Sequence, residues 1–119
     1  IKERQREEIE RRIEVLRKGE PLPEIGGRTV ILVDDGIAMG STMRASIRLC
    51  KHRGAAKIVV AAPVAGEQIV RDLRRLVDEV VVVETPAYFR AVAQVYRDWY
   101  DVPDTEVLEI MARWREDQR

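Results

Sequence analysis

The residues whose types and spacing could do chemistry lie together in "TVILVDDGIAMGSTM", residues 29–43. A run of aliphatic residues leads into two adjacent aspartates, Asp34 and Asp35, and then into a loop poor in bulky side chains. A loop that opens a helix offers free N–H groups and the positive end of the helix dipole, which together favour an anion. Glycines let the backbone approach that anion closely, and hydroxyls add donors. The glycines and hydroxyl residues of this loop are Gly36, Gly40, Ser41 and Thr42.

The two aspartates need a separate explanation, because carboxylates beside a phosphate repel it. They fit a ligand that also offers hydrogen-bond donors, such as a sugar diol, or one that brings a metal ion. A metal-only site and an ordinary strand–turn–helix with solvated acids are the alternatives. A Walker A loop is not supported, because the glycines are one residue too close and the lysine is missing. A dinucleotide-binding G-x-G-x-x-G is absent.

Apolar periodicity places this loop within alternating strands and helices. Three short runs are continuously apolar and β-branched, as strands covered on both faces are. Between and around them lie amphipathic segments of helical period. We expect strands at residues 28–33, 57–64 and 79–84, and helices at residues 2–18, 42–53, 67–77, 87–96 and from Asp104, a predicted N-cap, onward.

This order predicts right-handed crossovers and a parallel sheet, and therefore an open α/β sandwich. Ligands of such sheets bind beyond the carboxyl ends of the strands, where the two aspartates follow the first strand. We expect one domain over residues 1–119. It would comprise a charged helix (1–18), a linker (19–28) and an α/β core (29–119).

Composition narrows the classes of partner. The 119 residues hold 21 basic and 21 acidic side chains, and this balance gives no net field for nucleic acid or a membrane surface. No apolar run approaches the roughly 20 residues of a membrane span. The single cysteine, Cys50, fits a reducing compartment and the helix stripe of a core. We therefore expect a cytoplasmic protein that binds a small molecule.

The motif "VILVDDGIAMGSTM" resembles the PRPP-binding motif of type I phosphoribosyltransferases. The segments "GAAKIVVAAPVA" and "VVVVETPAYFRAVAQVYRDWYDVPDTEV" are similar to the distal half of a bacterial and archaeal group within that family. The resemblance covers roughly residues 22–110. It implies a three-layer α/β sandwich of the phosphoribosyltransferase type, incomplete at the N-terminus.

The resemblance also implies roles for individual residues. Asp34 and Asp35 would bind the ribose 2′ and 3′ hydroxyls of phosphoribosyl pyrophosphate (PRPP), with Mg²⁺ carried by the PRPP. Tyr88 or Phe89 would contact the acceptor. No catalytic base is assigned. The residues that would bind the 5′-phosphate are Ala38, Met39, Gly40, Ser41 and Thr42.

The chain departs from the family pattern in three places. Met39 stands where the family usually has Thr, which removes one hydroxyl donor to the phosphate. Ala38 occupies a position where purine salvage members often carry a catalytic Asp. The pyrophosphate loop and the flexible loop of the family precede the motif, and here only a charged helix and a linker precede Thr29.

Three functions follow from these observations. The first is a phosphoribosyltransferase, or a fragment of one, that transfers the 5-phosphoribosyl group of PRPP to a nitrogen acceptor and releases pyrophosphate. The second is a non-catalytic PRPP- or nucleotide-binding regulatory module. The third is a structural piece that folds only as a homo-oligomer. In that case the N-terminal helix would pair through the stripe formed by Ile9, Ile13 and Leu16.

Overall fold

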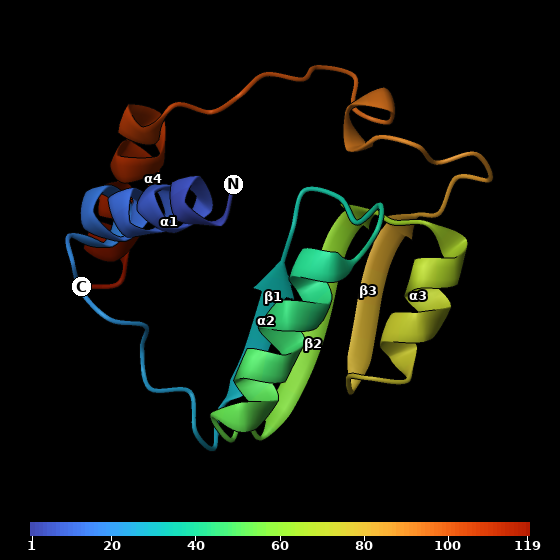
Figure 1. Ribbon diagram of the computed structural model, residues 1–119, viewed down its shortest axis with the longest axis horizontal. Helices are drawn as coiled ribbons and strands as arrows, with labels where there is room; N and C mark the ends of the chain where they lie inside the picture. The colour runs from blue at the N-terminus through green and yellow to red at the C-terminus, as the bar shows by residue number, and fades with distance from the viewer. The chain divides into compact units, whose positions relative to one another are not determined.

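The structure is a computed structural model that describes residues 1–119. Its helices and strands alternate as the periodicity predicts (Figure 1). The elements are α1 (Lys2–Arg17), β1 (Thr29–Val33), α2 (Ser41–His52), β2 (Lys57–Val64), α3 (Glu67–Arg74), β3 (Glu79–Glu84), the 3₁₀ turn η1 (Val92–Gln94) and α4 (Asp104–Asp117).

The chain forms two compact units. One consists of Ile1–Pro23 together with Tyr100–Arg119, and the other of Glu24–Trp99. The single domain expected over residues 1–119 stays a prediction. None of the helices is both long and apolar enough to cross a bilayer.

The unit Glu24–Trp99 is built on a three-stranded sheet in the order β1-β2-β3. Both pairings are parallel, and their register places Leu32 beside Val60 and Val60 beside Val80. Each connection between neighbouring strands contains a helix, α2 or α3, as parallel strands require (Figure 1). The α/β class with a parallel sheet is confirmed.

The core of this unit lies between the sheet and its two helices. The central strand β2 alternates, so that Ile58, Val60, Ala62 and Val64 are buried. The side chains of α2 and α3 that pack against this face of the sheet are Met43, Ile47, Cys50, Val70 and Leu73. Cys50 is thus the small core residue that its helical spacing predicts.

The opposite face of the sheet carries exposed apolar side chains. Ile31 and Val33 of β1, and Val81 and Val83 of β3, alternate with the residues that pack on the helices. The strands therefore have the composition of strands that are buried on both faces. In this unit α2 and α3 cover only one face of the sheet. A third layer of a sandwich would pack on the exposed face.

The unit formed by the two ends of the chain contains α1 and α4, neither of which has a buried residue. Arg11 of α1 donates hydrogen bonds to Asp104 Oδ2 at 2.8 Å and to Glu8 at 2.8 Å. Hydrogen bonds from Arg11 and Arg12 lower the pKa of Glu8 to about 2. Asp104 was predicted as the N-cap of α4. That prediction is wrong by one residue: Pro103 is the N-cap, and the Asp104 side chain pairs with Arg11 instead.

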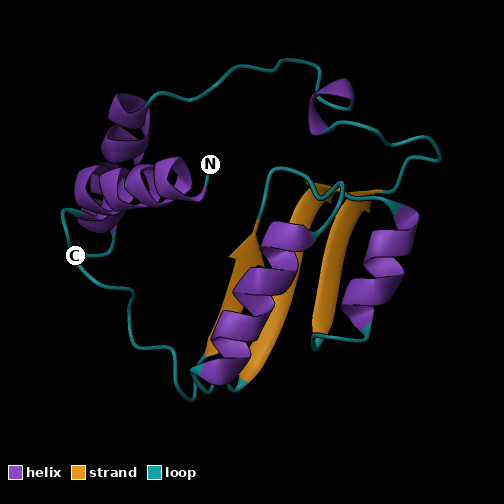
Figure 2. Ribbon diagram, in the orientation of Figure 1, coloured by secondary structure: helices purple, strands orange, loops and turns teal.

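The predicted helix over 87–96 is also wrong. This segment is a loop that contains only the short turn η1 (Figure 2). The Gln94 side chain accepts a hydrogen bond from the Ala91 amide, which closes one turn locally. Helix α3 ends at Arg74, three residues before the predicted end.

Candidate functional site

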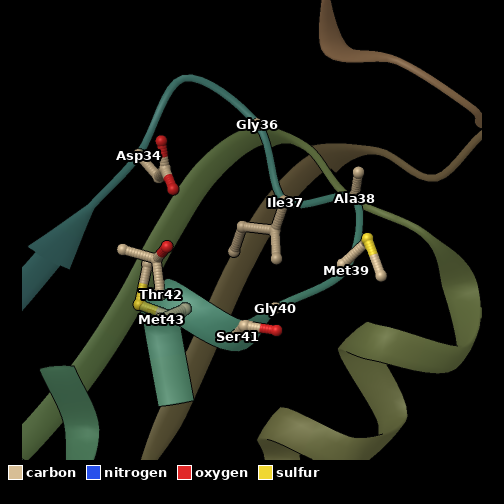
Figure 3. A pocket seen from close by; sticks show the side chains of 9 residues that line it. All are labelled: Asp34, Gly36, Ile37, Ala38, Met39, Gly40, Ser41, Thr42 and Met43. Atoms are coloured by element: carbon tan, nitrogen blue, oxygen red, sulfur yellow. The ribbon is translucent and has the colours of Figure 1, made fainter. Parts of the chain in front are cut away.

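The loop after β1 lines an open pocket of about 360 Å³ (Figure 3). The pocket is formed by one continuous stretch of chain inside the unit Glu24–Trp99. Its lining residues are Asp34, Gly36, Ile37, Ala38, Met39, Gly40, Ser41, Thr42 and Met43. The structure therefore brings one of the two predicted acids together with all five residues predicted to bind phosphate.

Hydrogen bonds to the end of β2 hold this loop in place. Ile37 is 2 % exposed, and its amide donates to the Val64 carbonyl at 3.0 Å. The Gly66 amide donates back to the Ile37 carbonyl at 3.2 Å. The loop is thus pinned at its middle by a buried residue, which leaves the residues on either side of Ile37 free to line the pocket.

The amides that follow Ile37 have no partner within the chain. The N–H groups from Ala38 to Met43 donate no hydrogen bond, and the first bond of α2 runs from the Arg44 amide to the Gly40 carbonyl at 2.9 Å. These free donors lie at the N-terminal end of α2, where the helix dipole is positive. The arrangement is suited to an anion such as a phosphate.

Gly40 gives this run of amides its shape. It is the N-cap of α2 and has a left-handed backbone, with φ of 81°. Residues with a Cβ rarely adopt this conformation, so the turn into the helix depends on glycine.

The two aspartates differ in their surroundings. Asp34 is half-buried and lines the pocket, and its Oδ1 accepts a hydrogen bond from the Asp35 amide at 2.8 Å. In Figure 3 the Asp34 carboxylate and the Thr42 side chain lie on the same side of the loop. Asp35 is more exposed and does not line the pocket. Partial burial and the neighbouring Asp34 carboxylate raise the pKa of Asp35.

Met39 lines the pocket at the position where the sequence motif departs from the family. Its side chain is 79 % exposed and can turn toward solvent. The amide of Met39 is among the free donors. The position therefore keeps its backbone donor and loses only a side-chain hydroxyl.

Gly36 has a packing role beside the one predicted for it. It is buried, and a Cβ at this position would lie 2.6 Å from both methyl carbons of Val92. Glycine is required here because the segment after β3 packs directly on the turn, in addition to any approach of a ligand.

Two residues of this packing, Val92 and Tyr96, were missed by sequence reasoning. The Tyr96 hydroxyl donates a hydrogen bond to the backbone carbonyl of Asp35. Burial, followed by the charges of Asp35 and Asp34, raises the pKa of Tyr96. The apolar spacing of 87–96, read as a helix, was the only signal, and Val92 of this segment packs against the turn formed by Asp34, Asp35 and Gly36, called the acid turn below.

The predicted acceptor residues lie outside this pocket. Tyr88 is 94 % exposed. Phe89 lies near the start of α3, where its Cδ1 would be 3.9 Å from a Cβ on Gly66. Their role toward an acceptor stays a prediction.

Comparison with known proteins agrees with the motif. The family model of the phosphoribosyl transferase domain matches residues 2–98. Two curated Mycobacterium tuberculosis proteins, MT0597 and Rv0571c, are named provisionally as phosphoribosyl transferases. Each is 38 % identical over 117 residues, which are 98 % of this chain and 26 % of each relative.

A solved structure has the same fold. The crystal structure of TT1426 from Thermus thermophilus superposes with a TM-score of 0.81 at 38 % identity. The alignment covers 93 % of this chain and 53 % of TT1426, so the chain spans about half the length of that relative and about a quarter of the mycobacterial ones. From the match over residues 2–98, the chain belongs to the phosphoribosyl transferase domain family.

Proposed function

We propose that the loop after β1 binds the ribose 5-phosphate part of PRPP. The observation that carries this proposal is the run of free amides from Ala38 to Met43, which lies on the same pocket as the Asp34 carboxylate. A sugar phosphate presents an anion at one end and hydroxyl donors at the other. This pocket offers matching donors and an acceptor within one short stretch of chain.

The amides and hydroxyls bind the 5′-phosphate in this proposal. Hydrogen bonds to a charged group are the strong ones, and the dipole of α2 adds to them. The groups that would bind are the amides of Ala38, Met39, Gly40, Ser41 and Thr42 and the hydroxyls of Ser41 and Thr42.

The acid pair binds the ribose hydroxyls. Ionised carboxylates only accept hydrogen bonds, so they suit the donors of a diol and repel a misplaced phosphate. Asp34 is placed on the pocket, and Asp35 lies next to it in the turn.

The proposed reaction transfers the 5-phosphoribosyl group to a nitrogen acceptor and releases pyrophosphate. The bond from C1 to pyrophosphate breaks and a bond from C1 to nitrogen forms. The residues of this loop hold the sugar phosphate in position, and fixed dipoles stabilise the charge that develops.

Magnesium fits this site only together with the ligand. The structure contains no group of three or more side chains able to hold a metal ion. Mg²⁺ prefers six oxygen ligands and is commonly bound through one or two carboxylates plus substrate phosphates. Asp34 and Asp35 would supply carboxylate oxygens, and bound Mg²⁺ would neutralise pyrophosphate charge.

A second candidate is a binding module without turnover. The pocket is lined by a single loop, and Met39 replaces a usual hydroxyl donor. Both features fit a protein that keeps the sugar-phosphate site for regulation.

Calorimetry with PRPP and with ribose 5-phosphate separates these functions. A transferase is expected to prefer PRPP strongly, because contacts with pyrophosphate add to those with the sugar phosphate. Equal and weak binding of both ligands favours the binding module. Binding of neither ligand contradicts both and favours the structural role.

Removal of one acid charge tests the diol assignment. Asp35→Asn is expected to weaken ribose 5-phosphate by about tenfold or more, since hydrogen bonds to charged groups contribute about 1.5–3 kcal/mol. Asp101→Asn is the matched control, because Asp101 is an exposed carboxylate in the other unit. Unchanged affinity in Asp35→Asn would refute the role of Asp35.

A further inference from the structure

The segment after β3 contacts the acid turn at two points. Val92 packs against Gly36, where there is no room for a Cβ. Four residues later, the Tyr96 hydroxyl donates a hydrogen bond to the Asp35 carbonyl. Both contacts are made by residues far from the turn in sequence.

The Tyr96 ring has its own support. It meets Trp99 edge to face, with ring centroids 5.2 Å apart and an interplanar angle of 67°. Aromatic pairs in this geometry contribute about 0.5–1.5 kcal/mol beyond area burial. The side chain that holds Asp35 is therefore oriented by Trp99 at one end and by the Asp35 carbonyl at the other.

The Tyr96 hydroxyl bonds to the backbone of the turn and not to either carboxylate. The hydroxyl bonds to the carbonyl of Asp35, while the Asp34 carboxylate accepts the Asp35 amide at 2.8 Å. Both polar groups of the Asp35 peptide backbone thus have fixed partners. The peptide groups on either side of Asp35 cannot rotate without breaking one of these bonds.

We infer that Tyr96 is a positioning residue, whose hydroxyl fixes the backbone of Asp35 and thereby sets the direction of the acid pair toward the ribose hydroxyls. The inference rests on the proposed function, which assigns those hydroxyls to the acids. The sequence motif confines the site to the loop after β1. Tyr96 adds to it a residue from the segment that follows β3 in the sequence. A small misplacement of a binding group can cost a large factor in affinity or rate.

The test uses the full chain and the variant Tyr96→Phe, which keeps the ring on Trp99 and removes only the hydroxyl. We expect ribose 5-phosphate to bind about fivefold more weakly, the loss of about 1 kcal/mol typical of one neutral hydrogen bond. Inorganic phosphate, which reports on the amides of α2 alone, is expected to bind as in the wild type. Calorimetric titration with both ligands gives the two affinities.

Tyr100→Phe is the matched control. The Tyr100 hydroxyl also donates a hydrogen bond, to Glu106 at 2.9 Å, and lies in the other unit. Both affinities are expected to be unchanged in this variant. The inference is overturned if Tyr96→Phe leaves ribose 5-phosphate binding unchanged, or if it weakens both ligands equally, since equal loss indicates general damage to the loop.

A ligand-free measurement keeps this inference separate from the proposed function. If the wild type binds no sugar phosphate, the proposed function fails, and backbone ¹⁵N relaxation then decides the role of Tyr96. Order parameters of Asp34, Asp35 and Gly36 are expected to fall in Tyr96→Phe and not in Tyr100→Phe. Unchanged order parameters would overturn the positioning role.

A second variant serves if Tyr96→Phe does not fold. Val92→Ala loosens the contact with Gly36 and leaves the hydroxyl of Tyr96 in place. It is expected to weaken ribose 5-phosphate binding in the same direction and to leave inorganic phosphate binding unchanged. An unchanged affinity for ribose 5-phosphate would contradict the inference that contacts from the segment after β3 position this turn.

Discussion

At the scale of single residues, Asp35 carries a conflict between binding and stability. Partial burial and the Asp34 carboxylate raise its pKa, so the folded chain disfavours the charged form. The charged form is the one that accepts hydrogen bonds from a diol. Between the ordinary aspartate pKa of about 3.9 and the raised value, the folded chain binds more protons than the unfolded chain. Stability therefore falls as pH rises through this window and stays lower above it.

Asp35→Asn is expected to raise the thermal midpoint at pH 7 while it weakens ligand binding, because it removes the charge that folding disfavours. The difference from the wild type should vanish at pH values below the unfolded-state pKa, where both side chains are neutral. Calorimetric melting at pH 7 and at acidic pH measures it, with Asp101→Asn as the control. A lower midpoint at pH 7 would contradict this account of the raised pKa.

Met39→Thr restores a hydroxyl donor on the pocket. Inorganic phosphate is expected to bind about tenfold more tightly, because one hydrogen bond to a charged group contributes about 1.5–3 kcal/mol. Met111→Thr, on exposed α4, makes the same chemical change away from the pocket and should have no effect. No tightening in Met39→Thr would mean that the side chain at this position faces away from the phosphate.

At the scale of elements, the junction between the loop and α2 depends on a left-handed residue. Gly40→Ala is expected to lower the free energy of unfolding by about 1–2 kcal/mol, the cost of a Cβ in that conformation. It should also weaken inorganic phosphate binding, because the amides of α2 shift. Urea denaturation and phosphate titration measure the two effects.

The N-cap of α3 provides the matched glycine. Gly66 has φ of −65°, and a Cβ there would meet its nearest atom at 3.8 Å. Gly66→Ala is therefore expected to be neutral or stabilising by under about 1 kcal/mol. Equal destabilisation by the two substitutions would show that the backbone conformation at Gly40 is not what matters.

Local periodicity was sufficient to predict most elements, and the loop motif was sufficient to predict which residues line the pocket. Strands β2 and β3 have the predicted bounds, because continuous β-branched runs have few other stable structures. The loop residues are contiguous, so their proximity follows from the motif itself. The segment 87–96 could not be predicted in this way. Val92 and Tyr96 face the acid turn, a contact between distant parts of the chain that overrides helical spacing.

At the scale of the whole molecule, the exposed face of the sheet is the feature that composition alone could not reveal. The continuous apolar runs predict a sheet that is covered on both faces. In the structure α2 and α3 cover only one of them. The relatives that match this chain are longer, with TT1426 covered to 53 %. The apolar residues of this face suit a packing surface, whichever segment or copy would cover it.

Val83→Thr tests whether this face of the sheet is exposed to solvent. Val83 is 83 % exposed, so the isosteric change is expected to alter the free energy of unfolding by less than about 0.5 kcal/mol. It should also reduce the binding of a hydrophobic dye. Val60→Thr, at a fully buried position of β2, is the control and should cost about 1–3 kcal/mol for its buried hydroxyl. A comparable loss in Val83→Thr would show that this face is covered in solution.

The residues that line the pocket, Asp34 and Gly36 to Met43, belong to one short segment of the chain, and this has a consequence for the gene. The binding groups of the proposed sugar-phosphate site are therefore encoded in one short, continuous part of the gene. The residues that hold this segment in place lie outside it: Val64 and Gly66 bond to Ile37, and Val92 packs against Gly36. If this segment were moved into another protein, it would bring its binding groups with it. It would also need new contacts in that protein to fix its conformation.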